Sequence, residues 1–288
     1  MDSLKRTCKC AGYSFHKLFT KARGLAGLLV ALCYLQITLE PLRTLCAGYG
    51  EAVNLPGLAA YLMSDPTTSL VAGIGLLLLL GDAPFFDQAQ QYVFLRGGKG
   101  SWVWGQILYM LVTVALYLAV LAGAAAALMA PYCAWNGQWC RVLYTLTSDV
   151  GMPAQYGIAL DLPGAVMQLW SPWQALGLGL LLRWGALSGC AMLMFWLNLG
   201  LRVRPGVAAA LAVMLLDLAV AVGLPYQLYA LSPFSLGRLS LLNLGYNPYL
   251  PGLAVEMGVL WGFFALNLGL CLAVAKGADL GSQGYLTQ

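Results

Sequence analysis

Two opposite charges stand inside long apolar stretches of the sequence. Arg183 lies in the stretch 172–200, and Asp217 lies in the stretch 205–224. A lone charge at the centre of a membrane costs about 3 kcal/mol or more, and a partner of opposite sign offsets much of that cost. We therefore expect Arg183 and Asp217 to pair near the midplane of a membrane. Such a pair is either a salt bridge that fixes helix packing or a polar element of a translocation path.

A polar segment, residues 81–106, separates two strongly apolar stretches. It predicts a short amphipathic helix at the membrane surface, a glycine-rich turn, and an aromatic anchor at Trp102 and Trp104 where the chain re-enters lipid. A helix in this position can pass force between two membrane helices and a partner in the water. The segment carries the charged residues Asp82, Asp87, Arg96 and Lys99.

The eight cysteines do not have the distribution of a disulfide framework, because several lie in apolar stretches. Cys8 and Cys10 are expected to be reduced thiols, since a metal site would need two more ligands. Cys133 and Cys140 lie in a loop that we expect on the outer side of the membrane. An oxidised pair there is the alternative to two free thiols.

The sequence lacks the motifs of several enzyme classes. It has no G-x-x-x-x-G-K-[ST] phosphate-binding loop and no H-E-x-x-H zinc motif. Its single histidine argues against a Ser–His relay. The basic residues lie beside apolar stretches and not on a soluble face. Nothing in the sequence therefore indicates a nucleic-acid partner. We expect no catalytic residue, metal or cofactor in this chain, and a channel, transporter part or binding scaffold rather than an enzyme.

The elements that must position these residues are membrane helices. Hydrophobic residues make up 60% of the chain and charged residues only 9%, against about 25% charged in a typical soluble domain. The sequence therefore predicts an all-α integral membrane protein, in which Asp65 caps a helix that begins at Pro66. The predicted parts are an amphipathic interfacial segment (1–23), six spans within 24–276 (about 24–46, 66–81, 103–129, 172–200, 205–224 and 253–276) and a tail (277–288).

The distribution of Lys and Arg predicts the orientation of these spans. Positive residues gather in the loops on the cytoplasmic side of a membrane protein. One predicted face carries Lys5, Arg6, Lys9, Lys17, Lys21, Arg23, Arg96, Lys99, Arg202, Arg204 and Lys276, and the other carries only Arg43, Arg141 and Arg238. Both termini and the segment 81–106 are therefore expected to be cytoplasmic.

The outer connection 225–252 is too apolar for a freely solvated loop. It predicts re-entrant or interfacial half-helices whose irregular backbone is buried by other helices. Two small-x-x-x-small patterns, Gly185–Gly189 and Gly258–Gly262, indicate close contacts between helices.

The run DAPFFD at 82–87, followed by Tyr92, Leu95-Arg96 and WGQILY at 104–109, resembles the membrane subunits of bacterial ABC-2 type ABC transporters. The topology of the whole chain resembles theirs as well. The resemblance implies that residues 82–96 dock on a separate ABC ATPase, which binds ATP and Mg. The contact residues that it implies are Asp82, Asp87, Gln90, Tyr92 and Arg96. It also implies a unit of two permeases, identical or paralogous, with two ATPases in the bacterial plasma membrane. The implied substrate is an exported peptide or lipid-like amphipathic molecule, and the implied exit is lined by the segment 225–252.

Two other functions remain open. The chain could be a non-transporting scaffold or immunity protein that binds a ligand in the membrane. It could also be a gradient-driven secondary transporter that uses Arg183 and Asp217 as an ion or proton relay, although it has no detectable internal repeat.

Overall fold

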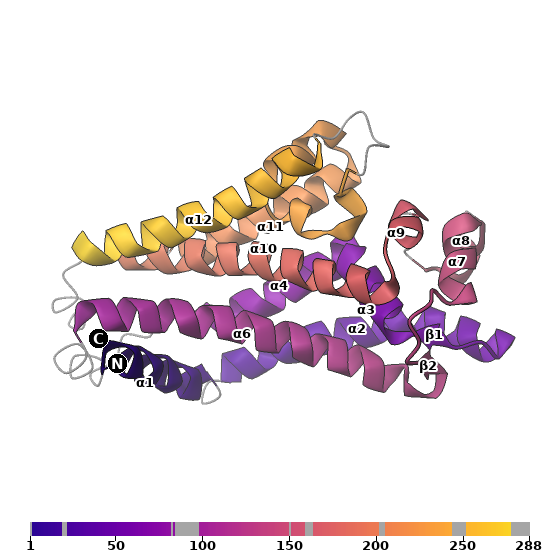
Figure 1. Cartoon of the computed structure of the whole chain (residues 1–288), viewed down its shortest axis with the longest axis horizontal. Helices are drawn as coiled ribbons and strands as arrows, with labels where there is room; N and C mark the ends of the chain where they lie inside the picture. Colours follow the sequence, from indigo (N-terminus) through magenta and orange to yellow (C-terminus); the bar gives the residue numbers. More distant parts are fainter. Residues whose placement is uncertain are drawn as a thin grey trace.

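The computed structural model describes residues 2–18, 22–81, 83, 98–149, 151–158, 164–201, 205–243 and 252–277. In these residues the protein is an all-α bundle of long apolar helices, with one parallel pair of two-residue strands (Figure 1). The predicted contact residues Asp82, Asp87, Gln90, Tyr92 and Arg96 lie outside the described residues, as does the tail beyond Gly277.

The long elements are α1 (Asp2–Leu18), α2 (Ala22–Tyr49), α3 (Leu55–Ser64), α4 (Pro66–Leu80), α6 (Lys99–Leu128), α10 (Pro172–Gly200), α11 (Gly206–Val222) and α12 (Leu253–Gly277). The short elements are β1 (Val53–Asn54), η1 (Ala130–Tyr132), β2 (Cys133–Ala134), α7 (Arg141–Ser148), α8 (Gly151–Tyr156), α9 (Gly164–Leu169) and the 3-10 helices η2 (Tyr226–Leu231), η3 (Ser235–Gly237) and η4 (Leu239–Leu241).

Among the described residues, four helices are long and apolar enough to cross a membrane, namely α2, α6, α10 and α12. The bent pair α3 and α4 makes a fifth if it counts as one span. Each of the six predicted spans coincides with a helix, but α11 has only 17 residues and falls short of the length of the others. The chain is therefore an all-α membrane protein with four or five candidate spans.

The break between α3 and α4 follows from local sequence. Asp65 has an extended backbone, which is the conformation that a following proline imposes on the residue before it. The Asp65 carboxylate accepts a hydrogen bond from the backbone N–H of Thr68 at 2.6 Å, so the predicted N-cap is confirmed. Helix α3, which the sequence analysis did not anticipate, meets α4 at 83° and is almost entirely buried.

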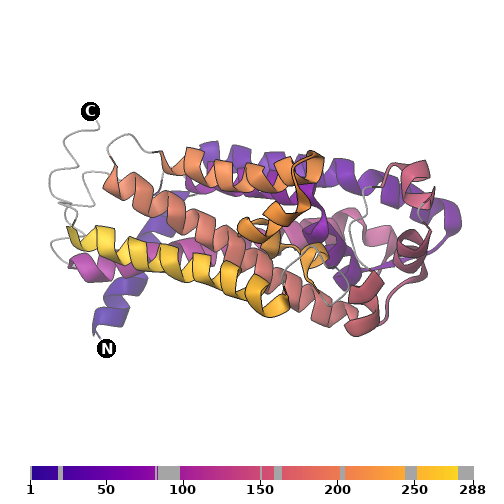
Figure 2. The same ribbon diagram turned by 90° about the horizontal axis from the view of Figure 1, so that it is seen from above.

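One end of the bundle gathers the start of α6 and the ends of α4, α10 and α12 (Figures 1 and 2). Asn198 donates from Nδ2 to the carbonyl of Ala83 at 3.0 Å, and Lys99 donates from Nζ to the carbonyl of Lys276 at 2.9 Å. The opposite end carries the strands and α7, α8 and α9. The long helices therefore alternate in direction, as consecutive membrane passes do.

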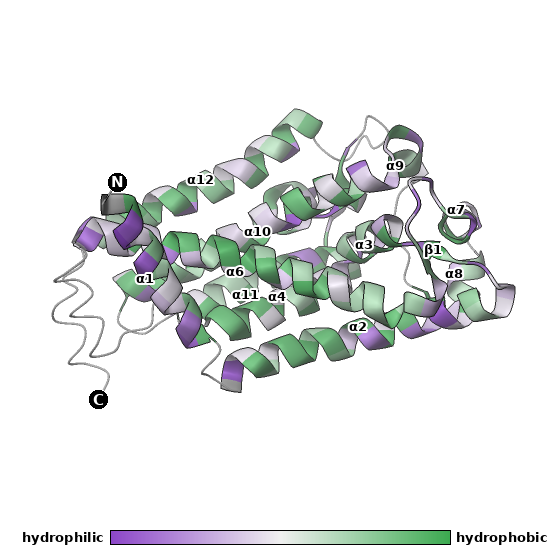
Figure 3. Cartoon of the chain, turned by 60° about the horizontal axis from the view of Figure 1, so that its bottom comes forward, coloured by the Kyte–Doolittle hydropathy of each residue, from purple (hydrophilic) through white to green (hydrophobic). Residues whose placement is uncertain are grey.

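Helix α1 is amphipathic, and its buried side packs on α6. Ser14 accepts a hydrogen bond from Nε2 of Gln106 at 2.6 Å. A Cβ on Gly105 would lie 2.7 Å from the Cβ of Cys10, so glycine at this position allows the two helices to touch. Figure 3 shows hydrophilic residues on α1 and hydrophobic residues along α2 and α6. The N-terminal helix is thus attached to the bundle through α6.

The connection after α11 folds back into the bundle. The prediction of half-helices for 225–252 differs from the structure, because residues 226–241 form the 3-10 helices η2, η3 and η4. Their core is nonetheless buried, with Phe234, Leu236 and Leu239 almost wholly covered. Buried irregular backbone at membrane depth needs partners within the protein.

The predicted glycine contacts divide into two groups. A Cβ on Gly189 would lie 2.6 Å from Cε1 of Phe263, and one on Gly185 would lie 3.1 Å from Cη2 of Trp261. Both glycines therefore admit aromatic rings of α12 to the surface of α10. Around Gly258 and Gly262 no described atom lies within 4 Å of such a Cβ.

Helices α2 and α4 cross where each has a glycine, and substitution there tests the crossing. A Cβ on Gly27 would lie 2.5 Å from the carbonyl oxygen of Gly75 and 2.8 Å from the Cβ of Leu78. We expect Gly27→Ala to lower the free energy of unfolding by about 1–3 kcal/mol, because the backbones must separate. Gly48→Ala on the same helix is the control, since its Cβ would meet no described atom within 4 Å. Thermal unfolding in detergent compares the two, and equal stability would contradict the close crossing.

The packing of α1 predicts unequal reactivity for its two cysteines. Cys8 is exposed, whereas Cys10 is buried against α6, and burial raises the pKa of the Cys10 thiol. Because the thiolate is the reactive form, a raised pKa leaves less of it near neutral pH. We expect a maleimide to modify Cys8 rapidly and Cys10 slowly in the folded protein, measured by peptide mass spectrometry. Comparable rates for the two would show that α1 does not stay on α6.

Candidate functional site

The break between α3 and α4 exposes backbone groups inside the bundle. The last turn of a helix has carbonyl groups without intrahelical partners, and these carry the negative end of the helix dipole. At the end of α3, the carbonyls of Met63 and Ser64 face α10 and the segment 226–241. Away from water, such groups need donors from other parts of the chain.

Two buried arginines supply those donors. Arg183 of α10 donates from Nη2 to the carbonyl of Met63 at 3.0 Å and to the hydroxyl of Ser69. Arg238, between η3 and η4, donates from Nη1 to the carbonyl of Ser64 at 3.4 Å. The hydroxyl of Ser240 donates to the same carbonyl at 3.0 Å. Two positive charges therefore cap the negative end of α3.

Asp217 has a different ion-pair partner from the one that the sequence predicts. Its Oδ1 accepts a hydrogen bond from Nη2 of Arg238 at 2.7 Å, and both side chains are only 1% exposed. The prediction placed Arg238 in an outer loop and paired Asp217 with Arg183. The connection after α11 instead buries Arg238, which thereby reaches Asp217 first. Both predicted charges, Arg183 and Asp217, are buried in the bundle.

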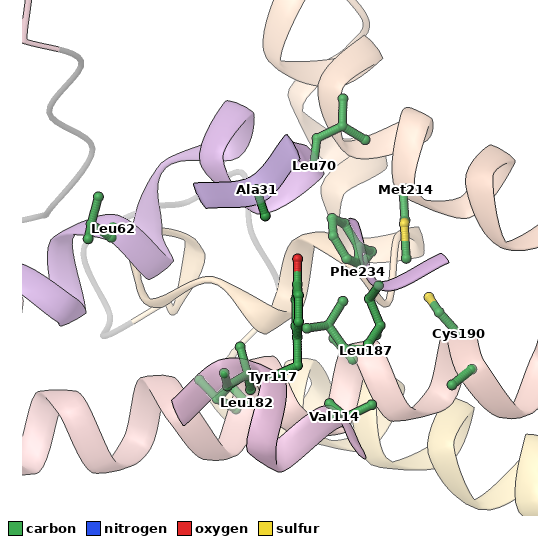
Figure 4. Packing of buried hydrophobic residues seen from close by; sticks show 14 of the residues in the cluster. Ala31, Leu62, Leu70, Val114, Tyr117, Leu182, Leu187, Cys190, Met214 and Phe234 are labelled. Carbon is green, nitrogen blue, oxygen red and sulfur yellow. The ribbon is translucent and has the colours of Figure 1, made fainter. Parts of the chain in front are cut away.

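Arg183 is held without a carboxylate in direct contact. It is 2% exposed, and no acidic side chain among the described residues lies within ion-pair distance of it. Its guanidinium lies 5.0 Å from the centre of the Phe234 ring, which adds a cation–π contact. A Cβ on Gly73 would lie 3.2 Å from Cζ of Phe234 and 2.7 Å from Sδ of Met214, so that glycine gives both side chains room against α4 (Figure 4).

A small cavity borders Arg183 on the side of α2 and α6. Its volume is about 50 Å³, and its walls come from α2, α3, α4, α6 and α10. Thr68, Ser69 and Arg183 are its polar residues, and leucine, alanine and methionine side chains make up the rest. The cavity is thus an apolar space with one polar side.

Several polar atoms at this site have no hydrogen-bond partner among the described residues. They are Nη1 of Arg183, Oγ1 of Thr68 and Oδ2 of Asp217, all buried. Leaving a buried polar group unpaired costs about 1–3 kcal/mol, and more for a charged group. Ionisable residues within a membrane that bear this cost mark a substrate or ion site by default.

Glu256, in the first turn of α12, fastens the far end of the same segment. It is fully buried, and its Oε2 accepts a hydrogen bond from the backbone N–H of Asn243 at 2.9 Å. This carboxylate joins the start of α12 to the connection that carries Arg238. Two carboxylates therefore hold the connection, Asp217 at Arg238 and Glu256 at Asn243.

The cysteine prediction concerns the opposite end of the bundle. All eight cysteines are free thiols in the structure, so the alternative of a Cys133–Cys140 disulfide is not what is found. Cys140 is buried beside Cys133, and burial raises the pKa of both thiols. Among the described residues, no cluster of three or more His, Cys, Asp or Glu side chains could hold a metal ion.

A scan against protein-family models, a search of curated proteins and a search of solved structures each find no match. The interpretation of the site therefore rests on its geometry and on the sequence.

Sequence reasoning missed Arg238, Thr68 and Ser69 as parts of this site. A signal for Arg238 was present, because it is the only charged residue in the apolar connection 225–252. The same argument that singled out Arg183 applies to it. For Thr68 and Ser69 the sequence carries no signal beyond their place in the first turn of a capped helix.

The buried pair predicts a non-additive effect of neutralisation. Asp217→Asn leaves the charge of Arg238 buried without its carboxylate, which costs about 3–5 kcal/mol of stability. We expect Asp217→Asn/Arg238→Gln to be less destabilised than the sum of the single variants, measured by thermal unfolding in detergent.

The control for this cycle is the exposed pair of Arg141 and Glu51, whose charged atoms are 3.8 Å apart. Exposed ion pairs contribute about 0–1 kcal/mol, so Glu51→Gln should change stability little. Additive losses in the Asp217 and Arg238 variants would show that these two residues do not act as a pair.

Proposed function

We propose that this protein is the permease subunit of an ATP-driven ABC transporter, which exports a peptide or lipid-like amphipathic substrate. The observation that carries the proposal is the buried charged cluster at the break between α3 and α4. Membrane transporters bind substrates and ions where a helix is interrupted near the middle of the bundle. Four buried ionisable side chains lie at this interrupted helix, namely Asp65, Arg183, Asp217 and Arg238.

Coupling to a separate ATPase is supported by the position of residues 82–96. In sequence they connect the end of α4 with the start of α6, and these two helix ends lie at the end of the bundle where α1 also lies. The exposed basic residues of the described chain at that end are Lys5, Arg6, Lys9, Arg23, Lys99 and Lys276. By the positive-inside rule this end and both termini are cytoplasmic, in a bacterial plasma membrane. ATP and Mg then bind to the ATPase, which explains the missing phosphate-binding loop.

The working unit proposed here has two permeases, identical or paralogous, and two ATPases. Helix α4 gives a direct mechanical route between the ATPase and the charged cluster. It begins at the Asp65 break and ends at residue 80, immediately before the coupling segment. With 15 residues, α4 spans about 22 Å as one rigid rod. A displacement of residues 82–96 then moves Ser69 relative to Arg183 and loosens the contacts that cap α3.

Asp217 supports a second candidate, a gradient-driven transporter. Its Oδ2 is buried and has no hydrogen-bond partner among the described residues, so the carboxylate has a site for a proton or a cation. In this alternative Asp217 relays the proton or cation, and the ion pair with Arg238 stabilises the charged form of its carboxylate. A passive binding scaffold would use the same cluster without ATP or a gradient.

Co-purification distinguishes these functions. We expect the tagged chain, extracted from its native membrane, to carry an ABC ATPase at a roughly equal amount by mass spectrometry. The double charge reversal Asp87→Lys/Arg96→Glu should release the ATPase, because both residues lie in the coupling segment. Asp149→Lys/Arg141→Glu, at the opposite end of the bundle, is the matched control and should retain it. Purification of the wild-type chain without any ATPase would overturn the ABC assignment and favour the gradient-driven alternative.

A further inference from the structure

We propose that the cavity beside Arg183 binds a carboxylate at the end of an apolar chain, with Arg183 and Thr68 holding the carboxylate. This inference deepens the proposed function by naming the ligand class of the same site. It rests on that function only for the transport of the ligand, because binding itself needs no ATPase.

Arg183 has a hydrogen-bond donor without an acceptor among the described residues. Arg183 is 2% exposed, and its Nη2 is used by the carbonyl of Met63 and the hydroxyl of Ser69. Its Nη1 is buried and has no partner among the described residues. Two buried carboxylates, those of Asp217 and Asp65, act on Arg183 from a distance and already have hydrogen-bond partners. A ligand carboxylate would give Arg183 the direct charged partner that it does not have among the described residues.

Thr68 provides a second donor at the same cavity. Its backbone N–H is taken by the Asp65 carboxylate at 2.6 Å, but its Oγ1 is buried and unpartnered among the described residues. Both Thr68 and Arg183 line the cavity. A carboxylate has two oxygens, so one can accept from the guanidinium of Arg183 and the other from the hydroxyl of Thr68.

The shape of the cavity selects a small head and an apolar tail. The cavity is small, about 50 Å³, which suits a small headgroup such as a carboxylate. Buried Leu35 and Ala59 form apolar wall, and the half-buried Ala72, Leu121 and Ala122 border the cavity toward the surface of the bundle. A chain attached to the carboxylate therefore has an apolar route to the surrounding lipid.

Two sources can present this chemistry, a fatty acid and the free C-terminus of an apolar peptide. The test measures the binding of radiolabelled dodecanoate near neutral pH to the purified wild-type chain in nanodiscs. The nanodisc lipids carry no net charge. Competitors are dodecanol, dodecyl phosphate, and one apolar peptide as the free acid and as the amide. We expect saturable binding, with dodecanoate at least about tenfold tighter than dodecanol, since a charge-assisted hydrogen bond is lost with the alcohol.

Thr68→Val tests the site without removing a structural contact. Because Oγ1 of Thr68 has no partner, the variant should keep the thermal stability of the wild type. We expect it to weaken dodecanoate binding about tenfold and to leave dodecanol binding unchanged. Ser188→Ala is the matched control, since it also removes a buried unpartnered hydroxyl but does not line the cavity. Arg183→Gln should abolish the preference for dodecanoate. If that variant does not fold, Ala122→Phe replaces it in the test, because the larger side chain should block the cavity.

The outcomes divide clearly. Competition by the free-acid peptide but not by its amide supports the carboxylate site and identifies the peptide as its source. Equal binding of dodecanoate and dodecanol, equal competition by dodecyl phosphate, or an unchanged affinity in Thr68→Val would overturn the proposal. Since no ATPase enters the assay, such a failure leaves the co-purification result standing, and a missing ATPase leaves the binding result standing.

Discussion

The rest of the structure depends on one constraint, which is that the buried carbonyls at the end of α3 need hydrogen-bond donors. The last carbonyls of α3 are buried within the bundle, and arginines from two distant segments donate hydrogen bonds to them. Arg183 comes from the middle of a long helix, whereas Arg238 comes from an irregular connection that must fold inward to reach the same place. Asp217 then balances Arg238. In an unbroken helix the carbonyls of Met63 and Ser64 would accept hydrogen bonds within the helix, and each arginine would lose that acceptor.

The two arginines differ in how completely the protein satisfies them. Arg238 has a carboxylate at 2.7 Å, so its charge is neutralised by the protein itself and its part is to hold the connection in the bundle. Arg183 has a carbonyl, a hydroxyl and an aromatic face, which stabilise a cation but do not neutralise it. The sequence analysis considered Arg183 and Asp217 as one pair, whereas the structure contains two buried arginines of which only Arg238 contacts a carboxylate among the described residues.

Helix α4 connects this charged cluster with the basic end of the molecule. Its first turn carries Thr68 and Ser69 beside Arg183, and its last residues lie close to the start of α2 and the end of α10. A single rigid element thus reaches from the site to the segment that resembles an ATPase-coupling helix. Such an arrangement suits a protein in which events at the membrane surface change the environment of a buried ligand.

The sequence by itself determined the long apolar helices and the start of α4, because these depend on local features: long apolar stretches, and a proline preceded by a capping aspartate at Asp65 and Pro66. It also identified Arg183 and Asp217 as buried charges, since each stands alone in an apolar helix. Only the tertiary structure decided the partner of Asp217 and the cavity between five helices. Both depend on how the connection 226–241 and helix α3 fold against residues far away in the sequence, and such long-range packing leaves no periodic signal in either segment.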